Sequence, residues 1–426
     1  MAALPSPIAE PSLADRLNAD CFCIEIDRER LWDEVDRRCD GVVPRAAMAN
    51  LVSNVPVFVS RSDHEAMIAI VRAIEAAVTK RAYRDRVLSW APDIARHDPG
   101  PIGVFTGYDF HLTPEGPRLI EVNTNAGGAF LCASATAAQT ACCAELENAA
   151  TATGAAFEAR VIAMFESEWR RQGRTTALRT IAITDDDPIG QALYWEFRLA
   201  EAMFERHGYE AVIADPRRLV HRHGRLWVDD LAIDLVYDRL VDFALDAPEH
   251  RALRDAHLAG DVVLTPSPRA HALYADKRNL AVLSDPEAMA GFGLATEDLA
   301  ALHGVPVTVP VTAANAEALW RERGAYYFKP AGGHAGKAVY RGDKTTRGVW
   351  ERIVAEGHHV AQRLVVPSRR NVLVDAIPTE RKADIRLYTH AGEVLLTAAR
   401  LYRGQTTNFH TVGGGLAPVV VLPECL

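Results

Sequence analysis

Residues 107–128 decide the fold of this chain, and they read Gly107-Tyr-Asp109-Phe-His-Leu-Thr113-Pro-Glu-Gly116-Pro-Arg-Leu-Ile-Glu121-Val-Asn123-Thr-Asn-Ala-Gly-Gly128. Residues 108–112 and 118–122 carry the alternation and the aromatic or branched side chains that are typical of strands. Between them, Pro114-Glu115-Gly116 suits a three-residue turn in which the glycine takes the left-handed position. The stretch therefore predicts a β-hairpin.

The predicted hairpin brings acidic and amide side chains together on one face. A three-residue turn pairs Thr113 with Pro117, which places Asp109 directly opposite Glu121, and Asn123 shares the face of Glu121. The hairpin carries no lysine or arginine on that face, and facing like charges destabilise a hairpin unless a cation lies between them. Two carboxylates and an amide suit Mg²⁺, which shares its other positions with substrate phosphates.

The alternative interpretation is a hairpin whose acidic residues merely face water. The run that follows it, Asn123-Thr-Asn-Ala-Gly-Gly128, argues against this, because it suits a close approach of the backbone to a ligand.

Composition excludes several classes of protein. The 426 residues suffice for two or three domains, and 49% hydrophobic with 24% charged residues is ordinary for a globular protein. The net charge of −9 argues against nucleic acid as the main partner. No apolar run reaches membrane-spanning length, and the N-terminus is not a signal peptide. The seven cysteines lack zinc-site spacing, which indicates reduced thiols and a cytoplasmic location (positions 21, 23, 39, 132, 142, 143 and 425).

The first half of the chain changes character near Thr180. Residues 1–100 read as mostly helical. Arg84 and Arg86 either face a phosphate or belong to a solvated helix face, and we favour the second interpretation. Residues 180–184, 191–207 and 209–214 then follow the order strand, helix, strand of a parallel α/β sheet. No GxGxxG motif follows the first strand, so a dinucleotide site is not supported. Residues 185–187, which are all aspartate, either lie near a substrate at the edge of the sheet or cap the next helix.

A glycine-rich loop follows a strand in residues 326–340. The strand ends at Lys329, and Gly332, Gly333 and Gly336 leave room for backbone N–H groups to close around phosphate oxygens. The loop is not a Walker A motif, because Lys337 precedes an alanine and a second strand. A simple turn is the alternative.

Two arginines near the C-terminus are predicted to lie on neighbouring strands. Residues 383–400 read as a hairpin that turns at Ala391-Gly392, so Arg386 and Arg400 emerge side by side. Arginines in this position are more often surface ion pairs than phosphate clamps.

Taken in order, these pieces resemble an ATP-grasp ligase. The resemblance rests on Lys277, the Phe328-Lys329-Pro330 loop, Gln362, Asp384-Ile-Arg386, Arg400 and Asn408 with the glycines at 413–415. In ordinary members the Asp…Glu-x-Asn metal hairpin follows these elements, whereas here it comes first. The order therefore resembles the circularly permuted ATP-grasp proteins that are related to glutathionylspermidine synthase.

The resemblance implies an α/β (α+β) fold and a set of roles. We expect a helical N-terminal region at 1–100, the permuted segment with the metal hairpin at 101–170, a pre-ATP-grasp α/β domain at 175–275 and the nucleotide-binding lobes at 276–426. The expected metal ligands for Mg²⁺ are Asp109, Glu121 and Asn123, and the expected catalytic residues are Arg386 and Arg400. The expected ATP-binding residues are Lys277, Lys329, Gly332, Gly333, Gly336, Gln362, Leu364 and Asn408.

The implied reaction joins a carboxylate to an amine. A small-molecule or peptide carboxylate attacks the γ-phosphate of ATP, and the amine then displaces phosphate from the acyl phosphate. No residues for glutathione or spermidine can be matched, so neither substrate is identified, and the oligomeric state stays open. A phosphotransferase with the same phosphate-binding groups is the second interpretation, and a non-catalytic nucleotide-binding module is the third.

Overall fold

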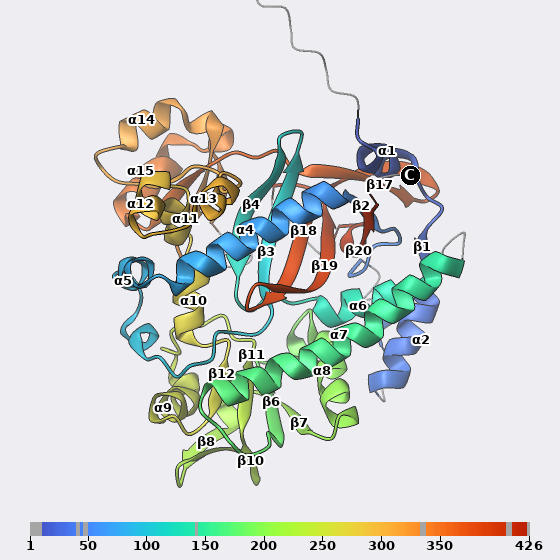
Figure 1. Cartoon of the computed structure of the whole chain (residues 1–426), viewed down its shortest axis with the longest axis vertical. Coiled ribbons are helices and arrows are strands. Elements are labelled where there is room, and N and C mark those ends of the chain that lie inside the picture. Colours follow the sequence, from blue (N-terminus) through green and yellow to red (C-terminus); the bar gives the residue numbers. More distant parts are fainter. Residues whose placement is uncertain are drawn as a thin grey trace, which may run out of the picture.

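The computed structural model describes residues 11–39, 43–45, 50–140, 144–332, 338–405 and 411–423, with the backbone alone for residues 140 and 144–155. Three larger sheets organise these residues, as Figure 1 shows. The α-helices are α1 (Leu13–Asp20), α2 (Arg28–Cys39), α4 (Arg61–Thr79), α5 (Arg81–Leu88), α6 (Ala129–Ala137), α7 (Ala144–Arg171), α8 (Tyr194–Arg206), α9 (Arg251–Ala259), α10 (Pro268–Tyr274), α11 (Arg278–Leu283), α12 (Pro286–Gly291), α13 (Thr296–Leu302), α14 (Ala316–Arg321) and α15 (Arg347–Glu356). No helix of the described ranges is long and apolar enough to span a membrane.

The largest sheet joins strands from both ends of the chain. Within the described residues its order is β2-β20-β19-β18-β3-β4, and β17 pairs with β18. Its strands are β2 (Val57–Ser60), β3 (Thr106–Thr113), β4 (Gly116–Asn123), β17 (Ser368–Val374), β18 (Ile377–His390), β19 (Glu393–Tyr402) and β20 (Gly415–Leu422). The hairpin β3–β4 therefore extends a sheet whose other long strands lie more than two hundred residues later in the chain.

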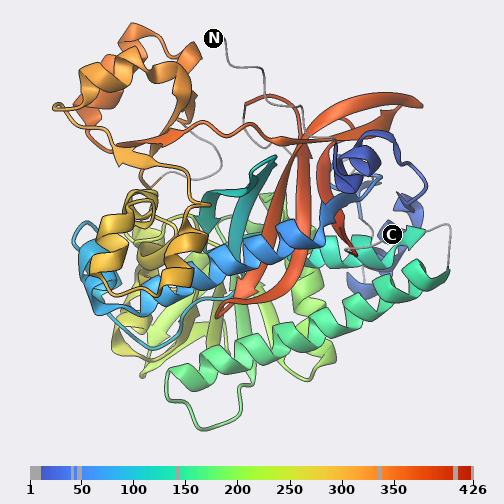
Figure 2. The same cartoon turned by 45° about the horizontal axis from the view of Figure 1, so that its top comes forward.

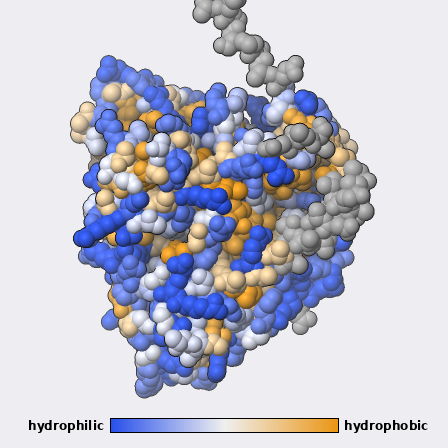
Figure 3. Space-filling model, viewed as in Figure 1, coloured by the Kyte–Doolittle hydropathy of each residue, from blue (hydrophilic) through white to orange (hydrophobic). Residues whose placement is uncertain are grey.

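Helices cover both faces of this sheet. The side chains of β19 belong to two separate hydrophobic cores. Leu396 and Ala398 lie in the first core, and Ala399 and Leu401 lie in the second. The apolar side of α4 packs into the second core, and α6 and α7 contribute to the first (Figures 1 and 2). On the face shown in Figure 3, hydrophilic residues dominate and apolar residues gather between α4 and α7.

The hairpin forms by a different route from the predicted one. Thr113 pairs with Gly116, so the turn has two residues, and Gly116 has the positive φ (99°) that glycine tolerates. That turn alone would shift the pairing by one residue. Ile120, however, is the extra residue of a β-bulge between the Phe110–Leu119 and Asp109–Glu121 pairs. The bulge restores the predicted register, and Asp109 lies opposite Glu121.

A parallel sheet follows at the predicted position. Its order is β12-β11-β6-β7, with strands β6 (Thr180–Thr184), β7 (Glu210–Ala214), β11 (Leu235–Asp238) and β12 (Val263–Thr265). The predicted strand–helix–strand unit is confirmed as β6–α8–β7. The described residues also form two smaller antiparallel sheets. One consists of β8 (Leu219–Arg222), β9 (Arg225–Val228) and β10 (Leu231–Ile233), and the other of β1 (Glu25–Ile26) and β5 (Gln139–Thr140).

The third large sheet carries the lysine strand. Its order is β13-β16-β14-β15, with β13 (Thr308–Pro310), β14 (Tyr326–Pro330), β15 (Tyr340–Arg341) and β16 (His359–Arg363). Its core contains Phe328 from β14, Leu319 from α14, and Trp350 and Ile353 from α15. Figure 2 shows α14, α15 and this sheet as a separate lobe. Since β16 ends at Arg363, Gln362 lies on the strand and Leu364 directly after it.

Candidate functional site

The predicted convergence of Asp109, Glu121 and Asn123 is present. Asp109 and Glu121 are paired across the hairpin. The amide nitrogen of Asn123 donates to Oδ2 of Asp109 at 3.0 Å and to Oε1 of Glu121 at 3.3 Å. In this arrangement the amide nitrogen lies between the carboxylates, and its oxygen remains for another ligand.

The expectation that no cation neutralises this face is wrong. β18 pairs with β3 so that Arg386 lies directly beside Asp109. The guanidinium of Arg386 donates to both oxygens of Asp109, at 2.6 and 2.7 Å, and Arg400 donates to Oδ2 at 2.7 Å. Asp109 is 1% exposed, so these are buried, charge-assisted bonds. The hairpin alone did not show them because the arginines come from a distant strand.

Arg400 also holds a second carboxylate. It faces Asp384 across β18 and β19 and donates to its two oxygens at 2.7 and 3.0 Å. Burial acts to lower the pKa of Arg400, but the carboxylates raise the pKa well above its usual range. The predicted side-by-side position of Arg386 and Arg400 is thus confirmed. The bonds to carboxylates use Nε and Nη2 of each guanidinium, and neither Nη1 donates to a described residue.

The three predicted metal ligands are not equally free to bind Mg²⁺. Asp109 accepts four hydrogen bonds, which occupy about all the lone-pair positions of a carboxylate. Glu121 accepts from Asn123 and has the Lys277 ammonium 3.9 Å from Oε2. No group of three His, Cys, Asp or Glu side chains suited to a metal occurs among the described residues. The donors that fit Mg²⁺ are therefore Glu121 and the oxygen of Asn123, with other positions left to phosphate oxygens.

Lys329 is a second lysine close to Glu121. Its ammonium donates to Oε1 of Gln362 at 2.7 Å and to the carbonyl of Ile120, the bulge residue, at 3.2 Å. Gln362 donates to the same carbonyl at 3.2 Å. Burial lowers the pKa of Lys329 to about 8. Since its hydrogen-bond acceptors here are neutral, this lysine has no hydrogen-bonded counter-ion in the described structure.

Lys277 approaches the same site from the start of α11. Burial acts to raise the pKa of Glu121, but the positive charges of Lys277 and Lys329 outweigh it and lower the pKa to about 2. The two predicted lysines and the predicted metal ligand Glu121 therefore belong to one electrostatic cluster. Backbone also links them, because the Lys277 N–H donates to the carbonyl of Ala331 at 2.9 Å, next to Gly332.

Of the remaining predicted ATP-binding residues, the structure describes Gly332 and Leu364. Gly332 is exposed, and a side chain there would meet no neighbour. Gly333, Gly336 and Asn408 lie outside the described residues. The N–H of Leu364 donates to the carbonyl of Ala325 at 2.9 Å, so this donor is already engaged.

Sequence analysis placed Asp185 at the edge of the parallel sheet but missed the two charged residues beside it, Asp238 and Arg239. Asp238 is the last residue of β11, Arg239 follows it, and Asp185 directly follows the neighbouring β6. Burial raises the pKa of Asp185 and of Asp238 to about 7. Arg239 is 6% exposed, and its Nε has no acceptor among the described residues. Polar residues directly after parallel strands were the available signal.

One glycine after the hairpin lies against this cluster. A Cβ on Gly127 would lie 2.9 Å from Nη2 of Arg239 and 2.5 Å from Cδ1 of Leu193, so a larger residue would displace these two side chains. The amide of Asn125 donates to the carbonyl of Leu240 at 3.2 Å. The run that we interpreted as approaching a ligand thus approaches the parallel sheet, and it connects Asn123 to Arg239. The capping alternative for the aspartates is not supported at Asp187, whose side chain makes no capping bond.

Comparison with known proteins identifies the class of fold. No protein-family model matches the sequence, and no curated protein does. Among solved structures, the chain is similar to a glutathione synthetase-like effector (GSS30) from Globodera pallida, with a TM-score of 0.54 and 13% identity over 93% of this chain and 98% of that one.

Two further solved structures align more weakly. A putative γ-glutamylcysteine synthetase from Methylobacillus flagellatus KT gives a TM-score of 0.43 with 12% identity, over 83% of this chain and 87% of that one. The ATP-grasp ligase PsnB, in complex with a phosphomimetic precursor variant, Mg and ADP, gives 0.27 with 17% identity, over 57% and 88%. These two likenesses are too distant to add to the first, which at 13% identity establishes the fold. The chain has a mixed α/β fold, as the sequence predicted, and this fold is similar to that of the glutathione synthetase-like effector.

Proposed function

We propose that this protein is an ATP- and Mg²⁺-dependent ligase that joins a carboxylate to an amine through an acyl phosphate. One observation carries the proposal: Lys277, Lys329 and Gln362 lie around Glu121, while Arg386 and Arg400 are bound to the facing Asp109. Phosphate-binding cations, a metal-ligand candidate and transition-state cations are thereby joined in one site. The glutathione synthetase-like fold supports the same class of reaction. We also infer that the element order is circularly permuted, since the metal hairpin precedes the lysine strands.

Lys277 and Lys329 are suited to bind phosphate oxygens of ATP. Both side chains are buried and both lie within reach of Glu121, which a triphosphate would approach together with its metal. Gln362 fixes the Lys329 ammonium, so its direction is set before nucleotide binds. The exposed Gly332 leaves space for phosphate at the end of the same strand.

Glu121 and Asn123 would hold Mg²⁺, because their oxygens are not fully used by the protein. A bound Mg²⁺ would neutralise charge on the β- and γ-phosphates while the γ-phosphoryl group moves. Asp109 has another task in this scheme, since it orients Arg386 and Arg400 rather than facing water.

Arg386 and Arg400 are suited to stabilise the transferring phosphoryl group. Their positions are fixed by bonds to Asp109 and Asp384, so no reorganisation is needed during the reaction. Their Nη1 groups, which no described residue accepts from, remain to bind the substrate carboxylate or the phosphoryl oxygens.

For the acid substrate, the structure offers the cluster at the carboxyl end of the parallel sheet. Arg239 is a buried cation with an unused donor, next to the loop that begins at Asn123. A second carboxylate or another anionic group of a small molecule or peptide substrate would pair with it. The amine would then reach the acyl phosphate from the same side.

Hydroxylamine trapping separates the ligase from the kinase. With ATP, Mg²⁺ and the correct acid, found by screening amino acids and short peptides, a ligase should give a hydroxamate without any amine substrate. Phosphate should appear free in solution in step with ADP. If the phosphate instead stays on a stable product and hydroxylamine has no effect, the phosphotransferase interpretation replaces this one.

Two variants should reduce trapping for different reasons. Lys329→Ala removes a contact to bound ATP and should mainly raise KM for ATP. Arg386→Lys keeps the charge but loses the bidentate hydrogen bonds to Asp109, so kcat should fall more than KM for ATP rises. Lys344→Ala, an exposed lysine in the same lobe as Lys329, is the matched control and should leave both constants unchanged.

A further inference from the structure

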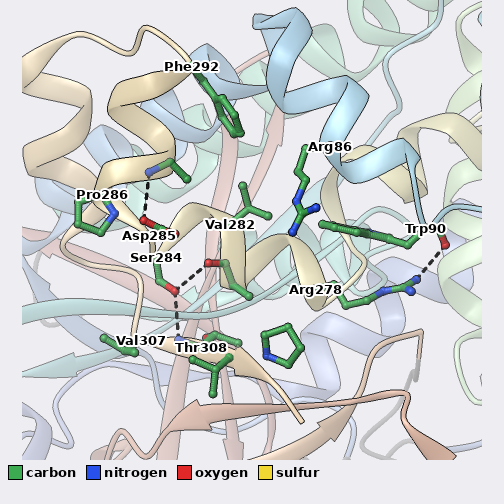
Figure 4. Close-up of a pocket in the computed structure, with 14 residues that line it drawn as sticks. Arg86, Trp90, Arg278, Val282, Ser284, Asp285, Pro286, Phe292, Val307 and Thr308 are labelled. Carbon is green, nitrogen blue, oxygen red and sulfur yellow. Dashed lines mark hydrogen bonds between the residues drawn. The ribbon is translucent and has the colours of Figure 1, made fainter. Parts of the chain in front are cut away.

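A second pocket lies outside the candidate ATP site. It has a volume of about 650 Å³ and lies between α5, α11, α12 and β13 (Figure 4). That volume is within the range of small-molecule sites, roughly 300–1,000 Å³. None of the predicted metal, ATP-binding or catalytic residues lines it. The proposed ligase reaction therefore does not account for it.

Most of the pocket wall is apolar. Val282 on α11 and Phe292 after α12 point into it from one side, and Val307 at the start of β13 from the other. Val307 is 54% exposed, an unusual position for a branched apolar side chain next to a concave surface. Such walls favour a ligand with an apolar body.

The charged residues that line the pocket are Arg86, Arg278 and Asp285, and Asp285 caps α12 by accepting from the N–H groups of Glu287 and Ala288. Arg86 and Arg278 both lie over the ring of Trp90, at 5.2 and 5.5 Å from its centroid. Arg278 is neutralised, because it donates to Asp276 at 3.0 and 2.5 Å and to the carbonyl of Trp90 at 3.1 Å. Arg86 forms no ion pair with any described residue, and Figure 4 shows its guanidinium pointing into the pocket.

Trp90 lines the pocket next to both arginines, which lie over its ring. Its indole N–H is shielded from solvent and has no acceptor among the described residues, so it is not open to a ligand in the pocket. The pocket wall beside Arg86 is therefore an aromatic ring, which suits the apolar body of a ligand whose anionic group reaches Arg86.

We propose that this pocket binds an apolar small molecule that carries one anionic group such as a carboxylate or sulfonate. The anion pairs with Arg86, and the apolar body packs against Val282, Phe292 and Val307. Arg86, which the sequence presented as part of a solvated helix face, is the residue that selects for charge. The site is independent of the proposed ligase activity.

The pocket nevertheless adjoins the candidate ATP site. Lys277 and Arg278 are consecutive, and the first approaches Glu121 while the second lines the pocket. On the other wall, Thr308 pairs with Gln362, which holds Lys329. A ligand in the pocket would therefore contact both elements that position the lysines.

Two fluorescent probes that differ in charge test the proposal. 1-Anilinonaphthalene-8-sulfonate is flat and anionic, and N-phenyl-1-naphthylamine has the same body without the sulfonate. Each is titrated into the full-length wild-type protein and into Arg86→Gln, Ala288→Phe and Arg81→Gln. Ala288 lines the pocket and is half-buried, so phenylalanine there fills the cavity. Arg81 is an exposed arginine on the same helix and serves as the matched control.

The anionic probe should bind the wild type at one site. Arg86→Gln should weaken it about tenfold, as expected for a charge-assisted hydrogen bond, and should leave the neutral probe unchanged. Ala288→Phe should remove both probes, and Arg81→Gln should affect neither. Melting curves matching the wild type exclude binding to unfolded surface. The proposal is overturned if Arg86→Gln leaves the anionic probe unaffected or weakens both probes equally, or if Ala288→Phe retains full binding.

Discussion

Replacing Asp109 by asparagine removes the negative charge that joins Arg386 to Arg400. Asp109 is almost completely buried and accepts two bonds from Arg386 and one from Arg400. Asparagine has nearly the same shape, so the change is one of charge and hydrogen bonding rather than of packing. The structure predicts that Asp109→Asn destabilises the fold, whereas two unshielded facing carboxylates would predict the opposite.

The size of the effect follows from what each arginine retains. Removing one partner of a buried ion pair costs about 3–5 kcal/mol. Arg400 keeps Asp384, at 2.7 and 3.0 Å, so the charge left without a partner is mainly that of Arg386. The asparagine oxygen still accepts one bond. We therefore expect the lower end, about 3 kcal/mol, or a melting temperature lowered on the order of 5 °C in a chain of this size.

Glu121→Gln gives the contrasting result. Its side chain is 29% exposed, its ion-pair partner Lys277 is 3.9 Å away and no arginine binds it, so its loss should cost less than the loss of Asp109. Thermal melting followed by circular dichroism should thus distinguish the two variants. Calorimetric titration of ATP, with excess Mg²⁺ and with chelator, should show that Glu121→Gln loses the Mg²⁺-dependent part of the affinity. Glu115→Gln, at the tip of the same hairpin, is the control for both measurements.

Two outcomes would refute this reasoning. If Asp109→Asn has the same melting temperature as the wild type, the buried ion pairs do not stabilise the protein. If Glu121→Gln keeps its full Mg²⁺-dependent gain in affinity, Glu121 is not a metal ligand.

Two further predictions concern Lys329 and Arg370. Burial lowers the pKa of Lys329 to about 8, and its charge is needed for phosphate, so kcat/KM for ATP should fall as pH rises through about 8. Lys329→Arg, which stays charged, should move that fall to higher pH; an unmoved fall would assign it to another group. Arg370 is 1% exposed and donates to four carbonyls, of residues 17, 18, 21 and 56, so Arg370→Met should lower the melting temperature and speed proteolysis near α1. Arg369→Met, the exposed neighbour paired with Glu380, should do neither, and equal proteolysis of the two variants would show that Arg370 does not anchor α1.

The hairpin shows which features of the site could be predicted from local sequence. Alternation and turn residues predicted both strands and the facing of Asp109 and Glu121, and these predictions are confirmed. The route was wrong, because the turn has two residues and Ile120 forms a bulge. The carbonyl of Ile120 accepts from Lys329 and Gln362, which lie more than two hundred residues later. A bulge held by such distant donors leaves no signal in the hairpin itself.

The electrostatics of the site depend on strand neighbours, which periodicity does not reveal. The sequence placed Arg386 and Arg400 on adjacent strands correctly, but it gave no reason to put β18 beside β3. That pairing gives the predicted metal ligand Asp109 hydrogen bonds from Arg386, and Arg400 on β19 adds another. Arg239 was missed for a related reason. Its position after β11 suggests a functional role only once the loop after Asn123 is known to contact this edge of the parallel sheet, and the sequence does not show that contact.

The balance of charge differs between the surroundings of Asp109 and those of Glu121. Asp109 and Asp384 are matched by Arg386 and Arg400, so that side is nearly neutral and rigid before any ligand binds. On the other side, Glu121 alone faces two lysines, and one of them bonds only to neutral acceptors among the described residues. This side has a surplus of positive charge in a buried setting, which raises its free energy until an anion arrives. A triphosphate would remove that surplus, and the matched arginines would then already be in place for its terminal phosphoryl group.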